Sequence, residues 1–301
     1  MVMMKLEDWR RRGQWFEHRG HPIFYIDEQR GPGPTLLLIH GFPTSSWDWA
    51  DLWPLIAPRF GRVIAVDMIG FGYSAKPPDY DYDLVDQATL HESLLSRLGV
   101  RQTHLLVHDY GVSVAQELLA RHRQRREPRS LELQSVTLLN GGLFPETHRA
   151  RLVQKLLLGP LGPLVSLLNN EQRFTRSLGA IFGPTTPLTS EHANGFWRLT
   201  TENSGHRLSH RLIRYILDRR RNRERWVTAL QETRVPLRVI NGPEDPVSGA
   251  HMVARYRQLV PRPDVVSLPN IGHYPQVEAP QAVANAFLPF IEHVEGMKTA
   301  S

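Results

Sequence analysis

Asp109 stands where an apolar run ends, at a position that would expose a catalytic side chain. Residues 105–107 (LLV) are typical of a buried strand, 108–111 (HDYG) form a polar break, and a helical pattern begins at Tyr110. A sharp turn from strand to helix is the usual place for a nucleophile at the end of a sheet, although serine is the commoner residue there. Asp109 could also be a simple N-cap of the helix. We favour the catalytic role because suitable partners follow later in the chain.

Carboxylate chemistry at Asp109 limits the reactions that such a site could perform. A carboxylate that attacks an acyl carbon gives only an anhydride, whereas attack on an electrophilic sp3 carbon gives an alkyl-enzyme ester that water can hydrolyse. The sequence therefore predicts a hydrolase that opens epoxides or displaces halide, with a small apolar organic molecule and water as its substrates.

Two further polar side chains follow the last two predicted strands. Asp245 lies in the turn after one of them, and His273 lies in the turn after the other. Ligands of open parallel sheets bind at the carboxyl ends of strands, so both side chains would lie near Asp109. His273 would activate water as a base oriented by Asp245, and the chain order of the three residues suits such a triad. The neighbouring Glu244 is expected to face water.

A glycine-containing motif, HGFP, begins at His40 and follows another predicted strand. A glycine there lets the backbone approach a reacting group closely. The backbone N–H groups of Phe42 and Tyr110 would form an oxyanion hole that acts when water attacks the ester. His40 and Pro43 are expected to bind substrate. The alternative is a plain Gly-Pro turn between a strand and a helix.

Two serines near glycines resemble a serine nucleophile only in part. Ser113 lies one helical turn past the strand end, so we expect it to be a helix residue. Ser74 follows a different strand and lacks the second glycine of the usual pattern. Neither is a candidate nucleophile.

The composition suits one large soluble domain with an insertion, or two domains. The chain has 301 residues, of which 41% are hydrophobic, and it contains no cysteine. The absence of cysteine excludes disulfide scaffolds and thiol nucleophiles. No metal or other cofactor is expected. We find no signal-peptide pattern and no membrane-spanning segment, so a cytoplasmic location is expected, without integral membrane association.

Basic residues give the chain a formal net charge of +6 at pH 7. They concentrate at 121–129 and 219–225, near the predicted ends of helices, where cations complement the helix dipole. Either run could be an anion or membrane-surface patch. We favour a solvated face for both, and nucleic-acid binding is not expected because aromatic residues are not interleaved.

The order of predicted elements indicates an α/β fold. Strands are expected at 15–19, 22–26, 36–40, 63–66, 103–107, 134–140, 237–241 and 265–268, and helices at 83–98, 110–123, 250–259 and 280–293. Several strands are apolar throughout, which is typical of a parallel sheet with helices on both faces. The tail from Gly296 is expected to fray.

One long segment interrupts the alternation of strands and helices. Residues 141–233 show helical periodicity and Gly/Pro punctuation but no convincing strand. We therefore expect a helical lid at 141–233, inserted after the sixth strand, between the two parts of the core at 1–140 and 234–301.

Over about residues 15–291 the chain resembles the α/β-hydrolase superfamily, in its epoxide hydrolase and haloalkane dehalogenase branch. The matching motifs are HGFP at 40–43, DMIGFGYS at 67–74, HDYG at 108–111, and Gly272-His273. Two longer stretches, NGGLFPETHR at 140–149 and FPTSS at 42–46, resemble the mesoderm-specific transcript group. The resemblance implies an eight-stranded, mostly parallel sheet.

The same resemblance implies roles for the residues at the matching positions. Asp109 would be the nucleophile, and Asp245 and His273 would be its charge partners. Phe42 and Tyr110 would be the backbone donors, and the peptide bond before Pro43 would be cis.

The leaving group separates epoxide opening from dehalogenation. An epoxide oxygen needs a proton or a strong hydrogen bond. In the epoxide hydrolases that this chain resembles, lid tyrosines supply it. Tyr215 is the one tyrosine between residues 141 and 233, and it resembles the second lid tyrosine of that family. The partner tyrosine is missing. A core tyrosine with a wet hydroxyl is the alternative for Tyr215.

A halide instead needs N–H donors, which dehalogenases take from a tryptophan after the nucleophile and from an asparagine or second tryptophan. Tyr110 and Phe42 occupy those places and have no side-chain N–H. Lid residues Trp197 or Trp226 could supply one. Epoxide hydrolysis is therefore favoured over dehalogenation.

A binding protein that kept the fold without catalysis is a further hypothesis, since fold does not imply function. The presence of all three triad residues argues against it. Either a monomer or a homodimer is compatible with the sequence.

Overall fold

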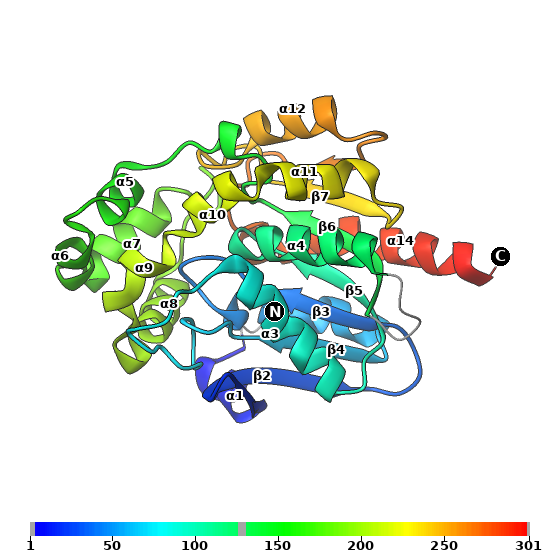
Figure 1. Cartoon of the computed structure of the whole chain (residues 1–301), viewed down its shortest axis with the longest axis horizontal. Helices are drawn as coiled ribbons and strands as arrows, with labels where there is room; N and C mark the ends of the chain where they lie inside the picture. The colour runs from blue at the N-terminus through cyan, green and yellow to red at the C-terminus, as the bar shows by residue number, and fades with distance from the viewer. Residues whose placement is uncertain (1–3, 126–130, 300–301) are drawn as a thin grey trace.

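The computed structural model describes residues 4–125 and 131–299 and contains an eight-stranded sheet (Figure 1). The strand order is β1-β2-β4-β3-β5-β6-β7-β8, and β2 runs antiparallel to both β1 and β4 while the other neighbours are parallel. The strands are Gly13–His18 (β1), His21–Gln29 (β2), Thr35–Ile39 (β3), Arg62–Val66 (β4), Gln102–Val107 (β5), Glu132–Leu139 (β6), Leu237–Asn241 (β7) and Val265–Ser267 (β8). The mostly parallel eight-stranded sheet predicted from the sequence is confirmed.

Both faces of the sheet are buried, because apolar side chains occupy successive positions of the central strands. In β3, Leu37 and Ile39 belong to one hydrophobic cluster, and Leu36 and Leu38 belong to another. Successive side chains of a strand point to opposite faces, so each cluster is a core on one side of the sheet.

Helices cover each core (Figure 1). One face packs against α3 (Leu84–Arg97), α4 (Tyr110–Gln124), α11 (Arg223–Glu232) and α12 (Ala250–Leu259). The other packs against α1 (Leu6–Arg11), α2 (Trp53–Ile56) and α14 (Pro280–Thr299). Shorter helices lie in the loops: η1 (Ser46–Trp49), η2 (Ala57–Arg59) and α13 (Pro275–Glu278).

The segment between β6 and β7 is helical, and the structure describes all of it. It contains η3 (Pro145–Thr147), α5 (Leu152–Leu158), α6 (Gly162–Leu167), α7 (Glu171–Gly179), α8 (Ser190–Thr201), η4 (Glu202–Leu208), α9 (Ser209–Leu212), α10 (Tyr215–Arg221) and α11. Helices α5 to α9 gather beyond one end of the sheet, at the left of Figure 1, whereas α11 lies beside α4. We propose that 141–233 is a lid, with α10 and α11 as its connection to the core.

The C-terminal tail differs from the expectation of fraying at Gly296. Helix α14 continues to Thr299, beyond Phe290, Ile291 and Val294, which are buried against the core. Along the described part of the chain, no helix has the length and apolar character needed to cross a membrane.

The basic runs are not simply solvated faces. Arg219 is 2% exposed, so the expectation for the second run is wrong at that residue. Of the first run, 126–129 lie outside the described residues. Carboxylates pair with other arginines of the two runs: Arg121 with Glu92 and Glu117, Arg223 with Glu146, and Arg225 with Glu117.

Candidate active site

Asp109 sits in a tight turn between β5 and α4. Its backbone angles are φ 41° and ψ −99°, in a region that residues with side chains seldom adopt. Gly111 makes the turn possible, because a Cβ at that position would lie 2.5 Å from the carbonyl oxygen of Ile39. The Asp109 side chain is buried and borders a cavity. The turn therefore presents a carboxylate at the end of the sheet.

One backbone N–H group donates to the Asp109 carboxylate, and a second follows Asp109 in the chain. The Phe42 N–H donates to Asp109 Oδ2 at 3.2 Å, and Tyr110 is the first residue of α4, where N–H groups have no partner within the helix. The close approach depends on Gly41, whose Cβ would lie 2.9 Å from the Cβ of Asp109. The peptide bond between Phe42 and Pro43 is cis, as the resemblance implied.

His273 and Asp245 form a buried pair. Nδ1 of His273 lies 2.7 Å from Oδ2 of Asp245. The Asp245 carboxylate also accepts hydrogen bonds from the Asn140 side chain, the Val247 N–H, and both the N–H and the hydroxyl of Ser248. The structure thus brings together Asp245 and His273, while Glu244 is exposed. Sequence analysis missed the contribution of Asn140 and Ser248, which lie in the turns after β6 and β7.

The pair has strongly shifted pKa values. Burial alone would raise the pKa of Asp245, but the charge and hydrogen bond of His273 outweigh burial and hold that pKa well below its usual range. Burial would lower the pKa of His273, yet the charge and hydrogen bond of Asp245, with the Asp109 carboxylate nearby, raise it to about 9. At neutral pH the structure therefore favours an imidazolium between two carboxylates.

A cavity of about 870 Å³ connects these residues to the lid. Asp109, His273, Phe42, Pro43 and Tyr215 are among the residues that line it. Most of the remaining wall is apolar and comes from α5, α6 and α7. The cavity therefore suits an apolar molecule whose reactive carbon reaches the carboxylate. Within the described residues, no three His, Asp or Glu side chains gather as a metal-binding group.

The sequence family model for the alpha/beta hydrolase fold matches residues 34–280. The chain belongs to the α/β-hydrolase fold family. It is 43% identical to the mesoderm-specific transcript protein of Mus musculus over 294 residues, which is 95% of this chain and 88% of that protein. The resemblance to the α/β-hydrolase superfamily and to the mesoderm-specific transcript group is thereby confirmed.

Solved structures of two enzyme classes share the fold of this α/β hydrolase. A loop variant of a haloalkane dehalogenase from Bradyrhizobium elkanii superimposes with a TM-score of 0.80 at 22% identity, covering 96% of this chain and 98% of that one. An epoxide hydrolase superimposes with a TM-score of 0.76 at 21% identity, covering 94% and 99%. At this identity the similarity shows the fold and leaves the choice between the two activities to the site.

Tyr215 of this α/β hydrolase lies in the cavity wall beside the carboxylate. Its ring packs against the rings of Phe42 and Tyr110, at centroid distances of 5.8 and 5.2 Å. Burial and then the Asp109 charge raise the pKa of the Tyr215 hydroxyl above its usual range. The hydroxyl is therefore protonated at neutral pH and available as a donor.

Three residues expected to bind substrate lie outside the cavity wall. Trp226 donates its indole N–H to Glu117 at 2.8 Å, because α11 packs against α4. Trp197 packs against rings of the lid. His40 is fully buried, with Nδ1 2.8 Å from the Gly41 carbonyl and Nε2 accepting from the Met68 N–H. His40 therefore orders the loop. None of the three lines the cavity, and of the residues expected to bind substrate only Pro43 does.

Arg219 is a site residue that sequence analysis missed. Its Nη2 donates to the Asp109 carbonyl oxygen at 2.9 Å and lies 3.5 Å from Asp109 Oδ1, and its Nε donates to the Ser113 hydroxyl at 2.7 Å. The guanidinium carbon lies 4.5 Å from the Tyr215 ring centroid. Arg219 therefore attaches α10 to the turn that contains Asp109. Tyr215 and Arg219 are four residues apart, a spacing that places them on one helix face and could have indicated the pairing.

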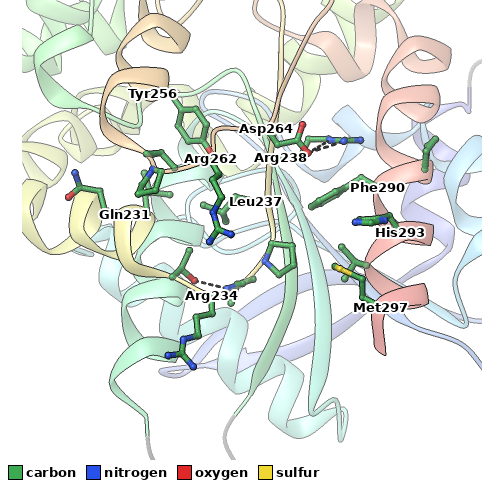
Figure 2. Close-up of a pocket in the computed structure, with 18 residues that line it drawn as sticks. Gln231, Arg234, Leu237, Arg238, Tyr256, Arg262, Asp264, Phe290, His293 and Met297 are labelled. Carbon is green, nitrogen blue, oxygen red and sulfur yellow. Dashed lines mark hydrogen bonds and ion pairs between the residues drawn. The ribbon is translucent and has the colours of Figure 1, made fainter. Parts of the chain in front are cut away.

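A second cavity, of about 660 Å³, lies between the C-terminal helix and the loops near β7 and β8 (Figure 2). Arg234, Arg238 and Arg262 are among the residues that line it, and Arg238 is paired with Asp264. None of Asp109, Asp245 or His273 borders it. Asp109 and His273 border the first cavity instead, and Asp245 borders neither of the two.

The charge of Asp109 should be visible in the titration of His273. The Asp109→Asn variant removes one negative charge that raises the His273 pKa, so we expect that pKa to fall below the parent value of about 9. NMR titration of labelled histidine side chains measures the value. The Asp245→Asn variant removes the larger of the two charges' effects on the His273 pKa, so that pKa should fall further. An unchanged His273 pKa in both variants would contradict the arrangement.

The pair also makes stability depend on pH. Because folding raises the His273 pKa from 6.5 to about 9, the stabilisation is complete below pH 6.5 and is lost as pH rises through about 9. The Tm of the parent should therefore fall over this interval more steeply than that of Asp245→Asn.

Arg219 should stabilise the fold chiefly by neutralising Asp109. Arg219→Met leaves the buried carboxylates of Asp109 and Asp245 facing one cation, so we expect the free energy of unfolding to fall by about 3–5 kcal/mol. Urea unfolding measures the change, and the exposed neighbour Arg220 provides the control variant Arg220→Met, expected within about 0.5 kcal/mol of the parent. In an Asp109→Asn background the loss should shrink. Equal losses in both backgrounds would refute the charge interaction.

Proposed function

We propose that the protein is a hydrolase that forms and then hydrolyses an alkyl-enzyme ester on Asp109, and that it converts an epoxide to a vicinal diol. The observation that carries the proposal is that Asp109, His273, Phe42 and Tyr215 line the same apolar cavity, where the Phe42 N–H donates to Asp109. An aspartate in this position favours attack on an sp3 carbon over acyl transfer.

In the first half-reaction, a carboxylate oxygen of Asp109 attacks one epoxide carbon and the carbon–oxygen bond of the ring breaks. The released oxygen takes a proton from the Tyr215 hydroxyl, whose position in the cavity wall supports this role. Ester formation neutralises Asp109. It thereby removes one charge that raised the pKa values of both Tyr215 and His273.

In the second half-reaction, water attacks the carbonyl carbon of the ester. His273 first gives its imidazolium proton to the Tyr215 phenolate that the first half-reaction leaves. The neutral imidazole then takes one proton from that water, and the N–H groups of Phe42 and Tyr110 stabilise the oxyanion. Collapse expels the diol oxygen, which takes the proton back from His273. The other water proton remains on the Asp109 carboxyl group and then passes to His273. Asp109, Tyr215 and His273 thereby regain their starting protonation, and the cycle closes without a net change in protons.

Haloalkane dehalogenation is the second candidate, because it would use the same ester and because a dehalogenase structure shares the fold. The residues of the cavity wall favour an epoxide over a haloalkane as the substrate. Neither Trp197 nor Trp226 borders the cavity, whereas Tyr215 does. A binding protein without catalysis is less favoured, since the buried Asp245–His273 pair has a free-energy cost that binding of an apolar molecule does not require.

Blocking the second half-reaction should trap the ester. In His273→Gln the base is lost but Asp109 and its donors remain, so a reactive epoxide should leave a covalent adduct on the Asp109 peptide, detected by mass spectrometry. Steady-state turnover should fall by a factor of about 10²–10⁴. The matched control, His273→Gln with Asp109→Asn, should form no adduct. Parental turnover without an adduct would move the base elsewhere.

Removing the Tyr215 hydroxyl should distinguish the two leaving groups. Tyr215→Phe keeps the ring contacts and deletes one donor, so epoxide turnover should fall by about 10²–10³, by analogy with the loss of an oxyanion donor. Turnover of a haloalkane with the same carbon skeleton should change little. Tyr82→Phe is a control, since the Tyr82 hydroxyl donates to the Pro77 carbonyl outside the cavity wall. Equal losses for both substrates would argue against Tyr215 as the leaving-group donor.

A further inference from the structure

Large apolar side chains are exposed mainly on one part of the lid. Within the described residues, ten large hydrophobic side chains are exposed, and seven of them belong to α5, α6 and the residues next to them. They are Leu152, Val153, Leu156, Leu161, Leu164, Leu167 and Leu168. We call this set the lid patch. A contiguous patch of this kind on a protein surface usually marks an interaction site.

The lid patch adjoins the entrance of the catalytic cavity. Leu152, Val153, Leu156 and Leu168 are exposed and also line the cavity that contains Asp109. In Figure 1, α5 and α6 form the edge of the molecule farthest from the C-terminus. A molecule that enters the cavity past these residues would come from an apolar surface and not directly from bulk water.

The lid patch is fixed to the rest of the lid. Helix α6 packs against α9, and Gly162 allows the approach of α5 and α6, because a Cβ there would lie 2.2 Å from the Leu157 carbonyl oxygen. The Ser166 hydroxyl accepts a hydrogen bond from the His210 N–H at 3.0 Å, and Leu157 is buried. One side of the helix pair is therefore already packed, and the exposed leucines are on the other.

Positive charge accompanies the lid patch. Between residues 149 and 176 the sequence has five cationic side chains, Arg149, Arg151, Lys155, Arg173 and Arg176, and one acidic residue, Glu171. Two of the arginines donate to backbone carbonyl groups, Arg151 to Ala180 and Arg173 to Leu168. Among the described residues, no carboxylate forms an ion pair with any of the five. The cations are thus available to an external anionic surface.

We propose that the lid patch docks on an anionic lipid bilayer and that apolar substrates enter the cavity from the membrane. Apolar side chains that insert at the headgroup boundary, with cations around them, are the features that surface-bound proteins use. The charge distribution favours an anionic bilayer over a second copy of this chain, whose own lid patch would carry the same positive charge. The membrane-docking part stands on the patch alone, whereas the delivery of substrate rests on the proposed function.

Vesicle sedimentation tests the docking surface. The purified full chain should sediment with vesicles of equal parts phosphatidylglycerol and phosphatidylcholine, and at least tenfold less with pure phosphatidylcholine. Leu161→Ser/Leu164→Ser/Leu167→Ser alters exposed patch residues outside the cavity wall and should lower binding at least tenfold. The control Leu217→Ser/Met297→Ser alters exposed apolar residues elsewhere and should bind like the parent.

A charge variant and an activity measurement complete the experiment. Arg149→Gln/Lys155→Gln should weaken binding to anionic vesicles, and added salt should do the same. The triple leucine variant should keep parental turnover of a water-soluble epoxide but lose turnover of a vesicle-dissolved one. Binding to vesicles without any epoxide turnover would overturn the proposed function and the delivery of substrate but support the docking surface.

Two kinds of result, one in vesicle binding and one in oligomeric state, would overturn the docking surface itself. One is a parent chain that remains in the supernatant with anionic vesicles, or a triple leucine variant that binds as the parent does. The other is a parent that forms a stable dimer in analytical ultracentrifugation, with the triple leucine variant monomeric and neither bound to vesicles. The patch would then be an interface between copies of the chain.

Discussion

The conformation of Asp109 is the constraint on which the rest of the site depends. A positive φ at a residue with a side chain costs about 1–3 kcal/mol and persists only where the surroundings hold it. Here the Gly111 N–H donates to the carbonyl groups of His40 and His108, and Arg219 holds the Asp109 carbonyl. One turn thereby fixes the carboxylate, the first N–H of α4 and the contact between core and lid. Most of what the site can do follows from this turn.

Four buried charges alternate in sign around that turn. Arg219 faces Asp109, and His273 lies between Asp109 and Asp245. Buried charges of this kind are costly unless they are paired, and removing any one leaves its neighbours uncompensated. Ester formation would remove the charge of Asp109 and leave two cations facing one carboxylate. The protonated form of His273 would then be less favoured, at the stage where water needs a base.

Sequence patterns were sufficient where position along a strand determines position in space. Asp109, Asp245 and His273 each follow a parallel strand, so the topology of the sheet brings their turns to one end, and the structure places them there. Sequence patterns were insufficient where contacts with elements distant in the sequence decide the position of a side chain. Trp226 turns away from the cavity because Glu117 on another helix accepts its N–H, and Arg219 differs from its exposed neighbour Arg220 only in the face of α10 that it occupies.

The central claim is that the reaction proceeds through an ester on Asp109, and isotope placement tests it directly. With enzyme in excess over an epoxide in H₂¹⁸O, a single turnover should give a diol without the label and an Asp109 peptide that carries one ¹⁸O. The reason is that water attacks the carboxyl carbon and the product takes an oxygen from the protein. Mass spectrometry of product and peptide reads both. A diol labelled in the first turnover, with Asp109 unlabelled, would show direct attack by water and would contradict the account.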